Sequence, residues 1–242
     1  MSGRIYENCK DAIEETEREL FEMGLEVSGY SYQDKVVEGN DDFTTKELQA
    51  YSFDVMSPDP AEALQCVERW YGNTVRTWVE AEFEERVDPT GRGQNPGNAW
   101  RIRKEVWEQF LENTGRFAYT YSERMSPQLP PVIRELKAHP SSRQAIIELH
   151  SNVYDLPRLG GLRRIPCSMF YQFLIRNGAM DCIYVMRSSD FLTHFVDDLT
   201  LAILLQDYFR VQVDRSLAMG KFSMFVSSLH AFKKDLRAKG IF

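Results

Sequence analysis

The order of hydrophobic and polar positions divides the chain into helical and extended segments. Ile13, Leu20 and Phe21 recur at near-helical spacing before Gly24, which predicts a first helix ending at that glycine. Residues 44–53 (TTKELQAYSF) alternate like a half-buried strand. Helices are also predicted over residues 60–71, 98–112, 130–137 and 198–209, strands over 144–150 and 221–228, and an exposed loop over 87–98. Helices and strands mixed without repeats predict an α+β fold.

The strongest local signal is a β-hairpin over residues 164–190. Its two alternating runs meet at Asn177-Gly178, a pair suited to a tight turn that needs positive φ at both residues. Cys167 begins one arm and Arg187 ends the other, so both are expected at the open end. A cation near a thiol favours the thiolate, the nucleophilic form, although a strand cysteine is more often a small buried hydrophobic residue.

Composition and charge exclude several classes of function. With 242 residues, 43% of them hydrophobic, the chain suffices for one large domain or at most two small ones, and we expect a single domain over 1–242. The net charge of −7 and the absence of a Lys/Arg-rich run argue against nucleic acid as a partner. No stretch reaches the ~18 apolar residues of a membrane span. We therefore expect a soluble, cytoplasmic protein.

The four cysteines give no metal or disulfide pattern. They stand at positions 9, 66, 167 and 182, without a C-x-x-C motif or a Cys/His pairing. No metal site is predicted, and each cysteine is assessed alone.

The hairpin also carries a family resemblance. The matching residues are Pro166-Cys167, Gln172-Phe173, Gly178, Arg187-Ser188, Asp190 and a polar residue eight positions later. Without a gap, this series resembles the core pattern of the thymidylate synthase family. Weaker similarity links SSRQAII to the family's phosphate segment and SLHAF to its sugar clamp, so the match covers 141–232 well and the first hundred residues poorly. The resemblance implies a large mixed β-sheet flanked by helices, in a homodimer formed sheet to sheet.

The resemblance assigns roles to the residues of the hairpin. Cys167 would add to C6 of a pyrimidine nucleoside monophosphate, so that C5 can capture a one-carbon unit from 5,10-methylenetetrahydrofolate, the co-substrate. Arg187 would bind the phosphate and favour the thiolate, and Ser188 would add a hydrogen bond to the phosphate. Asp190 completes the substrate-binding Arg-Ser-x-Asp pattern. Arg143 would reach the phosphate of the neighbouring subunit's site.

The position of Asp198 indicates the base. Thymidylate synthases have asparagine there, whereas cytidylate hydroxymethylases of the same family have aspartate. In cytosine N4 donates and N3 accepts a hydrogen bond, which suits a carboxyl group that shares its proton. Two alternatives stay open: Asp198 or Asp197 caps the following helix, or the register differs by one residue. The pairs Met186-Arg187 and Cys167-Ser168 are also closer to the hydroxymethylase branch, in which water adds to the exocyclic methylene.

The late strand is expected to bind the sugar. His230 aligns with the family's 3′-hydroxyl ligand, but Phe232 replaces the usual tyrosine, which favours a ribonucleotide, CMP, as in hydroxymethylases of nucleoside-antibiotic biosynthesis. Ser228 is the candidate for positioning the water, with a plain strand serine as the alternative.

Two catalytic residues are predicted before the hairpin. Tyr119 resembles the family tyrosine near C5, where proton removal uses a water network. The family glutamate stands four residues before an aromatic residue, and counting back from Tyr71 gives Val67. The adjacent Glu68 is nominated in its place.

Three functions are compatible with the sequence. The leading one is a CMP 5-hydroxymethyltransferase, with the dCMP enzyme as a close variant. The second is a methylating enzyme acting on uridylate or deoxyuridylate. The third is a catalytically silent nucleotide-binding dimer.

Overall fold

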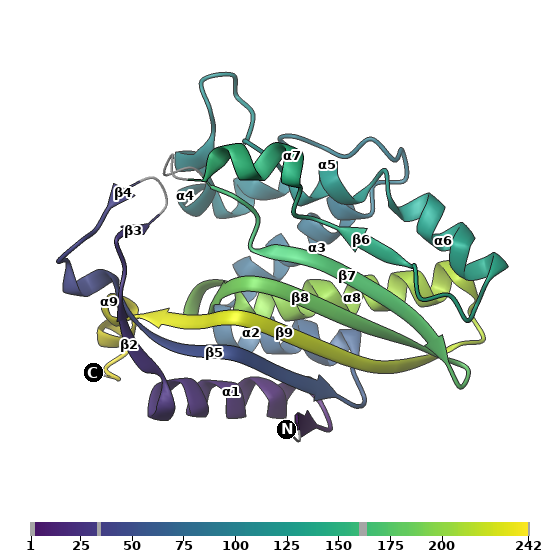
Figure 1. The fold of residues 1–242 in the computed structure, drawn as a ribbon, viewed down its shortest axis with the longest axis horizontal. Coiled ribbons are helices and arrows are strands. Elements are labelled where there is room, and N and C mark those ends of the chain that lie inside the picture. Colours follow the sequence, from purple (N-terminus) through teal and green to yellow (C-terminus); the bar gives the residue numbers. More distant parts are fainter. Residues whose placement is uncertain (1–2, 33–34, 160–163, 242) are drawn as a thin grey trace.

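The centre of the molecule is a mixed β-sheet. A computed structural model describes residues 3–32, 35–159 and 164–241. Within them a seven-stranded sheet has the order β1-β5-β9-β8-β7-β6, with β2 paired to β5 (Figure 1). Its strands are β1 (Arg4–Tyr6), β2 (Leu25–Ser28), β5 (Thr44–Val55), β6 (Ile146–Glu148), β7 (Ser168–Arg176), β8 (Ala179–Asp190) and β9 (Ala218–Phe232). The pairs β1–β5 and β8–β9 are parallel and the others antiparallel, and β3 (Ser31–Tyr32) pairs separately with β4 (Lys35–Val36).

Helices cover one face of this sheet. Helix α8 (Val196–Val213) packs on β8 and β9, and α2 (Pro60–Tyr71) and α3 (Asn73–Arg86) pack on α8. Figure 1 shows these three helices behind the sheet, whereas β5, β9 and β8 cross the front of the view with no described helix over them. Helix α1 (Cys9–Met23) packs against β5. The described part of the chain thus leaves the other face of the central strands without a helical cover.

Short helices complete the structure around the sheet. They are α4 (Lys104–Trp107), α5 (Tyr121–Met125), α6 (Leu129–Ala138), α7 (Asn152–Asp155) and α9 (Lys233–Ala238). Short 3-10 turns lie at Asp41–Phe43, Ala99–Arg103, Glu108–Phe110 and Leu156–Arg158, and a π-helical turn at Phe191–Phe195 precedes α8. The α+β fold with helices beside a mixed sheet is therefore confirmed.

The predicted hairpin is confirmed as β7 and β8. Asn177 and Gly178 have φ values of 49° and 74°, the positive φ at both turn residues that a tight hairpin turn requires. At the open end, the main-chain N–H of Arg187 donates to the carbonyl of Cys167 at 2.8 Å. The turn thus brings together two residues that stand twenty positions apart.

The helix predicted over 98–112 is confirmed only in part, because Ala99–Phe110 forms the short α-helix α4 between two 3-10 turns instead of one continuous α-helix. Its large side chains pack individually: Trp107 stacks on Trp78 with ring centroids 5.9 Å apart, and Arg103 turns inward to Asp197. Such tertiary contacts outweigh helical propensity in short segments. Helix α3 had no counterpart among the predicted helices. The loop over 87–98 has no regular element, but it is not wholly exposed, since Asp88 is buried.

The alternation of side chains between the two sheet faces shifts by one residue on β8 and β9 near the open end of the hairpin. Met186 and Ser189 are both buried although they are three residues apart, as are Val226 and Leu229 on β9. Period-two alternation would send such pairs to opposite faces. On β5, which pairs with β9, Ala50 has a φ of 51° and lies between Gln49 and Tyr51, whose partners on β9 are Ser228 and Val226. Because of this shift, the Ser189 side chain points toward α8, on the same face of the sheet as Met186. Strict alternation along β8 would place it on the opposite face.

Candidate functional site

Cys167 and Arg187 form the centre of the candidate site. Arg187 Nη2 lies 3.6 Å from Cys167 Sγ, and the hydroxyl of Ser188 lies 3.6 Å from the same sulfur. The guanidinium also donates to the carbonyl of Pro166 at 2.8 Å and to that of Ile165 at 3.0 Å. Within the described chain no carboxylate pairs with Arg187, so its charge is free to bind an anion beside the thiol.

The other three cysteines are placed differently. Cys9, Cys66 and Cys182 are buried, whereas Cys167 is half-buried. Burial raises the pKa of the Cys66 thiol to about 11, and it raises the pKa values of Cys9 and Cys182 as well. Cys167 alone among the four combines access with a neighbouring cation, so it is not the fully buried hydrophobic residue that a strand cysteine usually is.

The two adjacent aspartates at the start of α8 have different partners. Asp197 is 1% exposed and pairs with Arg103 Nη1 at 3.0 Å and with His194 Nδ1 at 3.4 Å. Asp198 is half-buried and accepts a hydrogen bond from Ser189 at 3.4 Å. No side chain caps α8, so the helix-cap alternative is wrong. Asp198 lies next to the Arg-Ser-Ser-Asp end of β8, and Asp197 serves a buried ion pair.

The environment of Asp198 favours a protonated carboxyl group. Burial, and then the negative charge of Asp197, raise its pKa to about 7, against the smaller opposing effect of His194. A carboxyl group that holds its proton near neutrality can both donate and accept a hydrogen bond.

Tyr119 and Tyr121 lie beside each other, with ring centroids 5.9 Å apart. Burial raises the pKa of Tyr119, and the guanidinium carbon of Arg124 lies 4.7 Å from its ring centroid. Tyr121, the first residue of α5, accepts a hydrogen bond from the main-chain N–H of Ser168 at 3.3 Å. The sequence pattern indicated Tyr119 but not Tyr121, although the pair of tyrosines in AYTYS was the available signal.

Arg164 adds a second cation that the sequence pattern did not indicate. Its guanidinium lies 4.0 Å from the ring centroid of Phe110 and 5.4 Å from that of Trp107. The indole Nε1 of Trp107 is buried without a hydrogen-bond partner among the described residues. Aromatic faces, a cation and an unpaired donor suit a conjugated ring system that carries carboxylates. The basic run just before Pro166-Cys167 was the available signal.

The expected sugar ligands lie beside the hairpin. In the parallel β8–β9 pair, Ser188 is opposite Ser228 and Asp190 is opposite His230. Asp190 accepts a hydrogen bond from the Leu192 N–H at 3.2 Å, and Ser228 donates to Glu47 at 2.9 Å. The register therefore brings four of the nominated residues into two adjacent rows.

Phe232 continues this row as a buried apolar side chain. Its ring meets that of His230 edge to face with centroids 5.3 Å apart, and it contacts Phe43 in the same way at 6.1 Å. An apolar ring thus borders the histidine.

Glu68 does not join this group through any contact of the described chain. It is exposed on α2 and pairs with Arg76 at 2.6 Å, whereas the adjacent Val67 is buried. Its role in proton transfer stays a prediction that these contacts do not support.

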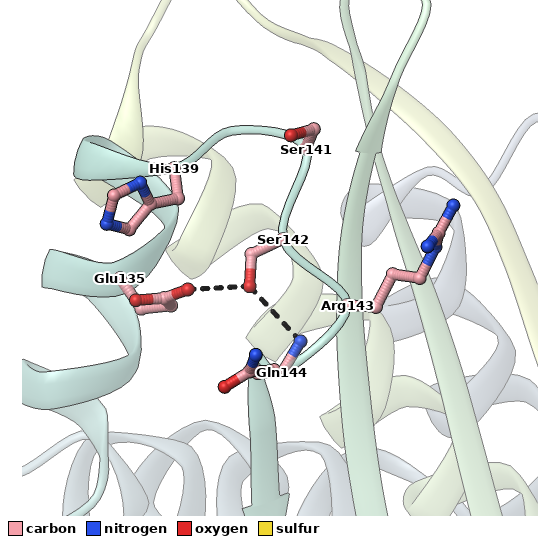
Figure 2. Close-up of a pocket in the computed structure, with 6 residues that line it drawn as sticks. All are labelled: Glu135, His139, Ser141, Ser142, Arg143 and Gln144. Atoms are coloured by element: carbon pink, nitrogen blue, oxygen red, sulfur yellow. Dashed lines mark hydrogen bonds between the residues drawn. The ribbon is translucent and has the colours of Figure 1, made fainter.

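Arg143 lies in a separate pocket between α6 and β6. The residues lining this pocket are Glu135, His139, Ser141, Ser142, Arg143 and Gln144 (Figure 2). Ser142 donates to Glu135 at 2.7 Å, whereas the exposed Arg143 side chain extends away from Glu135. The pocket contains neither Cys167 nor Arg187, so the structure does not bring Arg143 to them within one chain.

Neither metal ligands nor a membrane helix is found in the described ranges. No group of three or more His, Cys, Asp or Glu side chains there could hold a metal ion. No helix there has the length and apolar character needed to cross a bilayer.

Comparisons with known proteins place the chain in a family. The family model described as Thymidylate synthase matches residues 33–239. The chain is 26% identical over 159 residues to a thymidylate synthase of Rhodopseudomonas palustris (65% of this chain, 49% of that protein). It is 28% identical over 117 residues to a putative thymidylate synthase of Methanocaldococcus jannaschii (48% of this chain, 52% of that protein). The chain thus spans about half the length of these curated relatives.

A solved structure extends the likeness to almost the whole fold. The thymidylate synthase of T4 phage superimposes with a TM-score of 0.65 at 18% identity, covering 96% of this chain and 79% of the phage protein. At this identity the likeness concerns the fold.

Proposed function

The chain belongs to the thymidylate synthase family, and from that premise we propose that it is a CMP 5-hydroxymethyltransferase. In the proposed reaction a one-carbon unit passes from 5,10-methylenetetrahydrofolate to C5 of cytidylate, with addition of water, in the cytoplasm. The observation that carries the proposal is the contact of Cys167 with Arg187, a cation that no described carboxylate neutralises.

Cys167 supplies the covalent step. Its sulfur bonds to C6 and the electron pair of the C5–C6 double bond moves to C5, which makes C5 a nucleophile. Arg187 favours the thiolate and binds the phosphate, with the hydroxyl of Ser188 as a further donor. After C5 has gained the new carbon, the electron pair left by the C5 proton releases the folate and leaves an exocyclic methylene on C5. Once water has added to that methylene, the C5–C6 double bond re-forms, the Sγ–C6 bond breaks and its electrons return to sulfur. Tyr119, whose ring lies beside that of Tyr121, is proposed to order the water that carries the C5 proton.

The residues near the thiol fit the folate. When bound, 5,10-methylenetetrahydrofolate supplies a CH2 unit and leaves as tetrahydrofolate. Trp107 and Phe110 offer aromatic faces for its rings, and Arg164 offers a cation for its carboxylates. Water then adds to the exocyclic methylene. Ser228 donates its own proton to Glu47, so its oxygen lone pairs remain to accept a hydrogen bond from that water.

Asp198 supports cytosine as the base. A protonated carboxyl group donates to N3 and accepts from the N4 amino group. A protonated carboxyl group can also pair with uracil, by donating to O4 and accepting from N3–H, so the preference for cytosine rests on the aspartate that stands where thymidylate synthases have asparagine. The raised pKa of Asp198, about 7, supports the protonated form at neutral pH.

The sugar and the assembly are proposed from the late strand and the open face of the sheet. His230 would bind the 3′-hydroxyl, and the apolar edge of Phe232 beside it favours an altered sugar pocket, which we take to be that of a ribonucleotide. Ile183 and Phe225 lie half-buried on the sheet face without helices, which supports a sheet-to-sheet homodimer. In that dimer the exposed Arg143 would reach the partner's phosphate site.

Product masses test the proposal. The protein is incubated separately with CMP, dCMP, UMP and dUMP, each with 5,10-methylenetetrahydrofolate, and the nucleotides are weighed. A gain of CH2O on CMP is expected. A gain of CH2 on a uracil nucleotide would instead identify a methylating enzyme. Unchanged nucleotides that nevertheless bind would leave a binding protein.

A further inference from the structure

A buried ion pair lies on α3 and belongs to none of the roles above. Arg86 Nε lies 2.9 Å from Glu82 Oε1, and their side chains are 4% and 18% exposed. The Arg86 guanidinium carbon lies 4.6 Å from the ring centroid of Tyr121, and Arg86 Nη1 is buried without a hydrogen-bond partner in the described ranges. The cation is thus held by one carboxylate and one aromatic face.

Tyr121 connects this ion pair to the nucleophile. Its hydroxyl accepts the hydrogen bond of the Ser168 N–H, the amide that follows Cys167 directly. The Ser168 side chain in turn hydrogen-bonds the Tyr184 hydroxyl at 2.5 Å, and Tyr184 stacks on Tyr171 at 4.3 Å. The main chain after the thiol is therefore held on both sides by tyrosine hydroxyls.

We infer that Glu82, Arg86 and Tyr121 form a positioning network that holds Cys167 against Arg187. The inference rests on the proposed role of Cys167. None of the three touches the sulfur through a hydrogen bond in the structure, so all three are positioning residues. Glu82 orients Arg86, Arg86 fixes the ring of Tyr121, and Tyr121 fixes the Ser168 amide.

The physical need for such a network is geometric. The Arg187–sulfur contact is 3.6 Å long, and Cys167 lies just before β7, which has a bulge between Ser168 and Phe170. The main chain of Cys167 is held to β8 by the hydrogen bond from the Arg187 N–H to its carbonyl. A displacement of about 1 Å at a nucleophile can cost as much as a hundredfold in rate. Because burial raises the pKa of Tyr121, the phenol stays neutral and its ring can face the Arg86 cation.

The test uses alkylation of Cys167 and turnover. In the full chain, Tyr121→Phe keeps the ring but removes the oxygen that accepts from Ser168, and Arg86→Lys keeps the charge but loses the planar fork. The rate of iodoacetamide labelling at Cys167 is measured from peptide masses at several values between pH 6 and 9, roughly the range in which thiols titrate. This measurement needs no substrate. We expect about tenfold slower labelling at neutral pH and about tenfold lower kcat for Tyr121→Phe, with KM for the nucleotide nearly unchanged. For Arg86→Lys we also expect slower labelling and a lower kcat, with both changes smaller than in Tyr121→Phe.

Matched controls separate positioning from folding. Tyr154→Phe removes an exposed hydroxyl, and Arg76→Lys changes a surface arginine on the same helix α3. Both should label at the wild-type rate. A folded Tyr121→Phe and a folded Arg86→Lys that both label like the wild type would overturn the inference. If the wild type turns over none of the nucleotides, the proposed function fails, while the labelling rates still decide on the network.

Discussion

The guanidinium of Arg187 reaches the sulfur of Cys167 across the open end of the β7–β8 hairpin, with Nη2 and Sγ 3.6 Å apart. The same guanidinium donates to two main-chain carbonyls just before the cysteine, which fixes its orientation. A single side chain therefore both shapes the segment that presents the thiol and supplies a positive charge beside the sulfur.

Replacing Cys167 by serine should abolish turnover and preserve nucleotide binding. Serine is the weaker nucleophile and has no base beside it, so the product rate should fall by about a thousandfold or more, while the Kd for CMP changes little. Product mass and calorimetric titration measure the two effects. Activity that survives in a chain with Cys9, Cys66 and Cys182 replaced as well would show that the thiol assignment is wrong.

Exchanging Asp198 for asparagine should move base preference toward uracil. The amide presents a donor to O4 and an acceptor to N3–H, so the CMP/UMP ratio of kcat/KM should fall about ten- to a hundredfold. Both nucleotides compete in one reaction, and product masses give the ratio. An unchanged ratio would remove the argument for cytosine and put the uridylate function ahead.

Asp197→Asn is the matched control for that experiment. Because it breaks the buried pair with Arg103, it should lower the free energy of unfolding by about 3–5 kcal/mol. It should change the CMP/UMP ratio much less than Asp198→Asn does, since it acts on Asp198 only through the loss of a neighbouring charge. Denaturant unfolding gives the stability. A ratio that moved with Asp197→Asn and not with Asp198→Asn would place the base contact one residue earlier.

Binding of CMP should weaken as pH rises through about 7. The Asp198 carboxyl must keep its proton to donate to N3 of cytosine, and its pKa is about 7, so the affinity of the wild type for CMP should fall toward tenfold per pH unit above that value. Asp198→Asn has no carboxyl proton to lose and corrects for the ionisation of the phosphate. A wild-type affinity that follows that of Asp198→Asn between pH 6 and 9 (about two units on the alkaline side) would contradict the protonated carboxyl.

Protein stability should respond to the same group. The pKa of Asp198 is raised from 3.8 to about 7 on folding, so its stabilising contribution is complete below pH 3.8 and is lost as pH rises through about 7. As pH rises from 3.8 to about 7, the free energy of unfolding of Asp198→Asn should therefore increase relative to that of the wild type, by up to about 4 kcal/mol if the whole shift counts. Urea unfolding of both proteins at pH 5 and pH 8 (roughly the two sides of that transition) measures the difference. Equal differences at the two pH values would mean that Asp198 ionises normally in the folded protein.

Mixed dimers should recover activity if Arg143 acts across the interface. A chain with Arg143→Ala and a chain with Cys167→Ala are each expected to be inactive, and mixing them forms dimers with one site that holds both groups. About a quarter of wild-type activity is expected at full subunit exchange, from the statistics of random pairing. No recovery after verified exchange would argue against a shared site.

The sequence by itself determined the elements whose signals are local. The turn at Asn177-Gly178 needs positive φ at two adjacent residues, and that chemistry sufficed to place β7, β8 and the facing ends of Cys167 and Arg187. Helix α2 was also predicted with the bounds observed, Pro60–Tyr71, and the structure shows that local residues set these bounds, since Asp59 caps its start and Gly72 follows its end. The spacing of motif residues within one hairpin carried the family resemblance in the same way.

Only the tertiary structure decided which of two adjacent aspartates faces the candidate site. Asp197 pairs with Arg103, 94 positions away, and this contact leaves Asp198 to Ser189. The same kind of contact divided the helix predicted over 98–112 into one short α-helix and two 3-10 turns and brought Arg86 to Tyr121. Periodicity and turn chemistry act over a few residues, whereas the partner of a buried charge depends on which distant segments the fold packs together, and no local pattern contains that information.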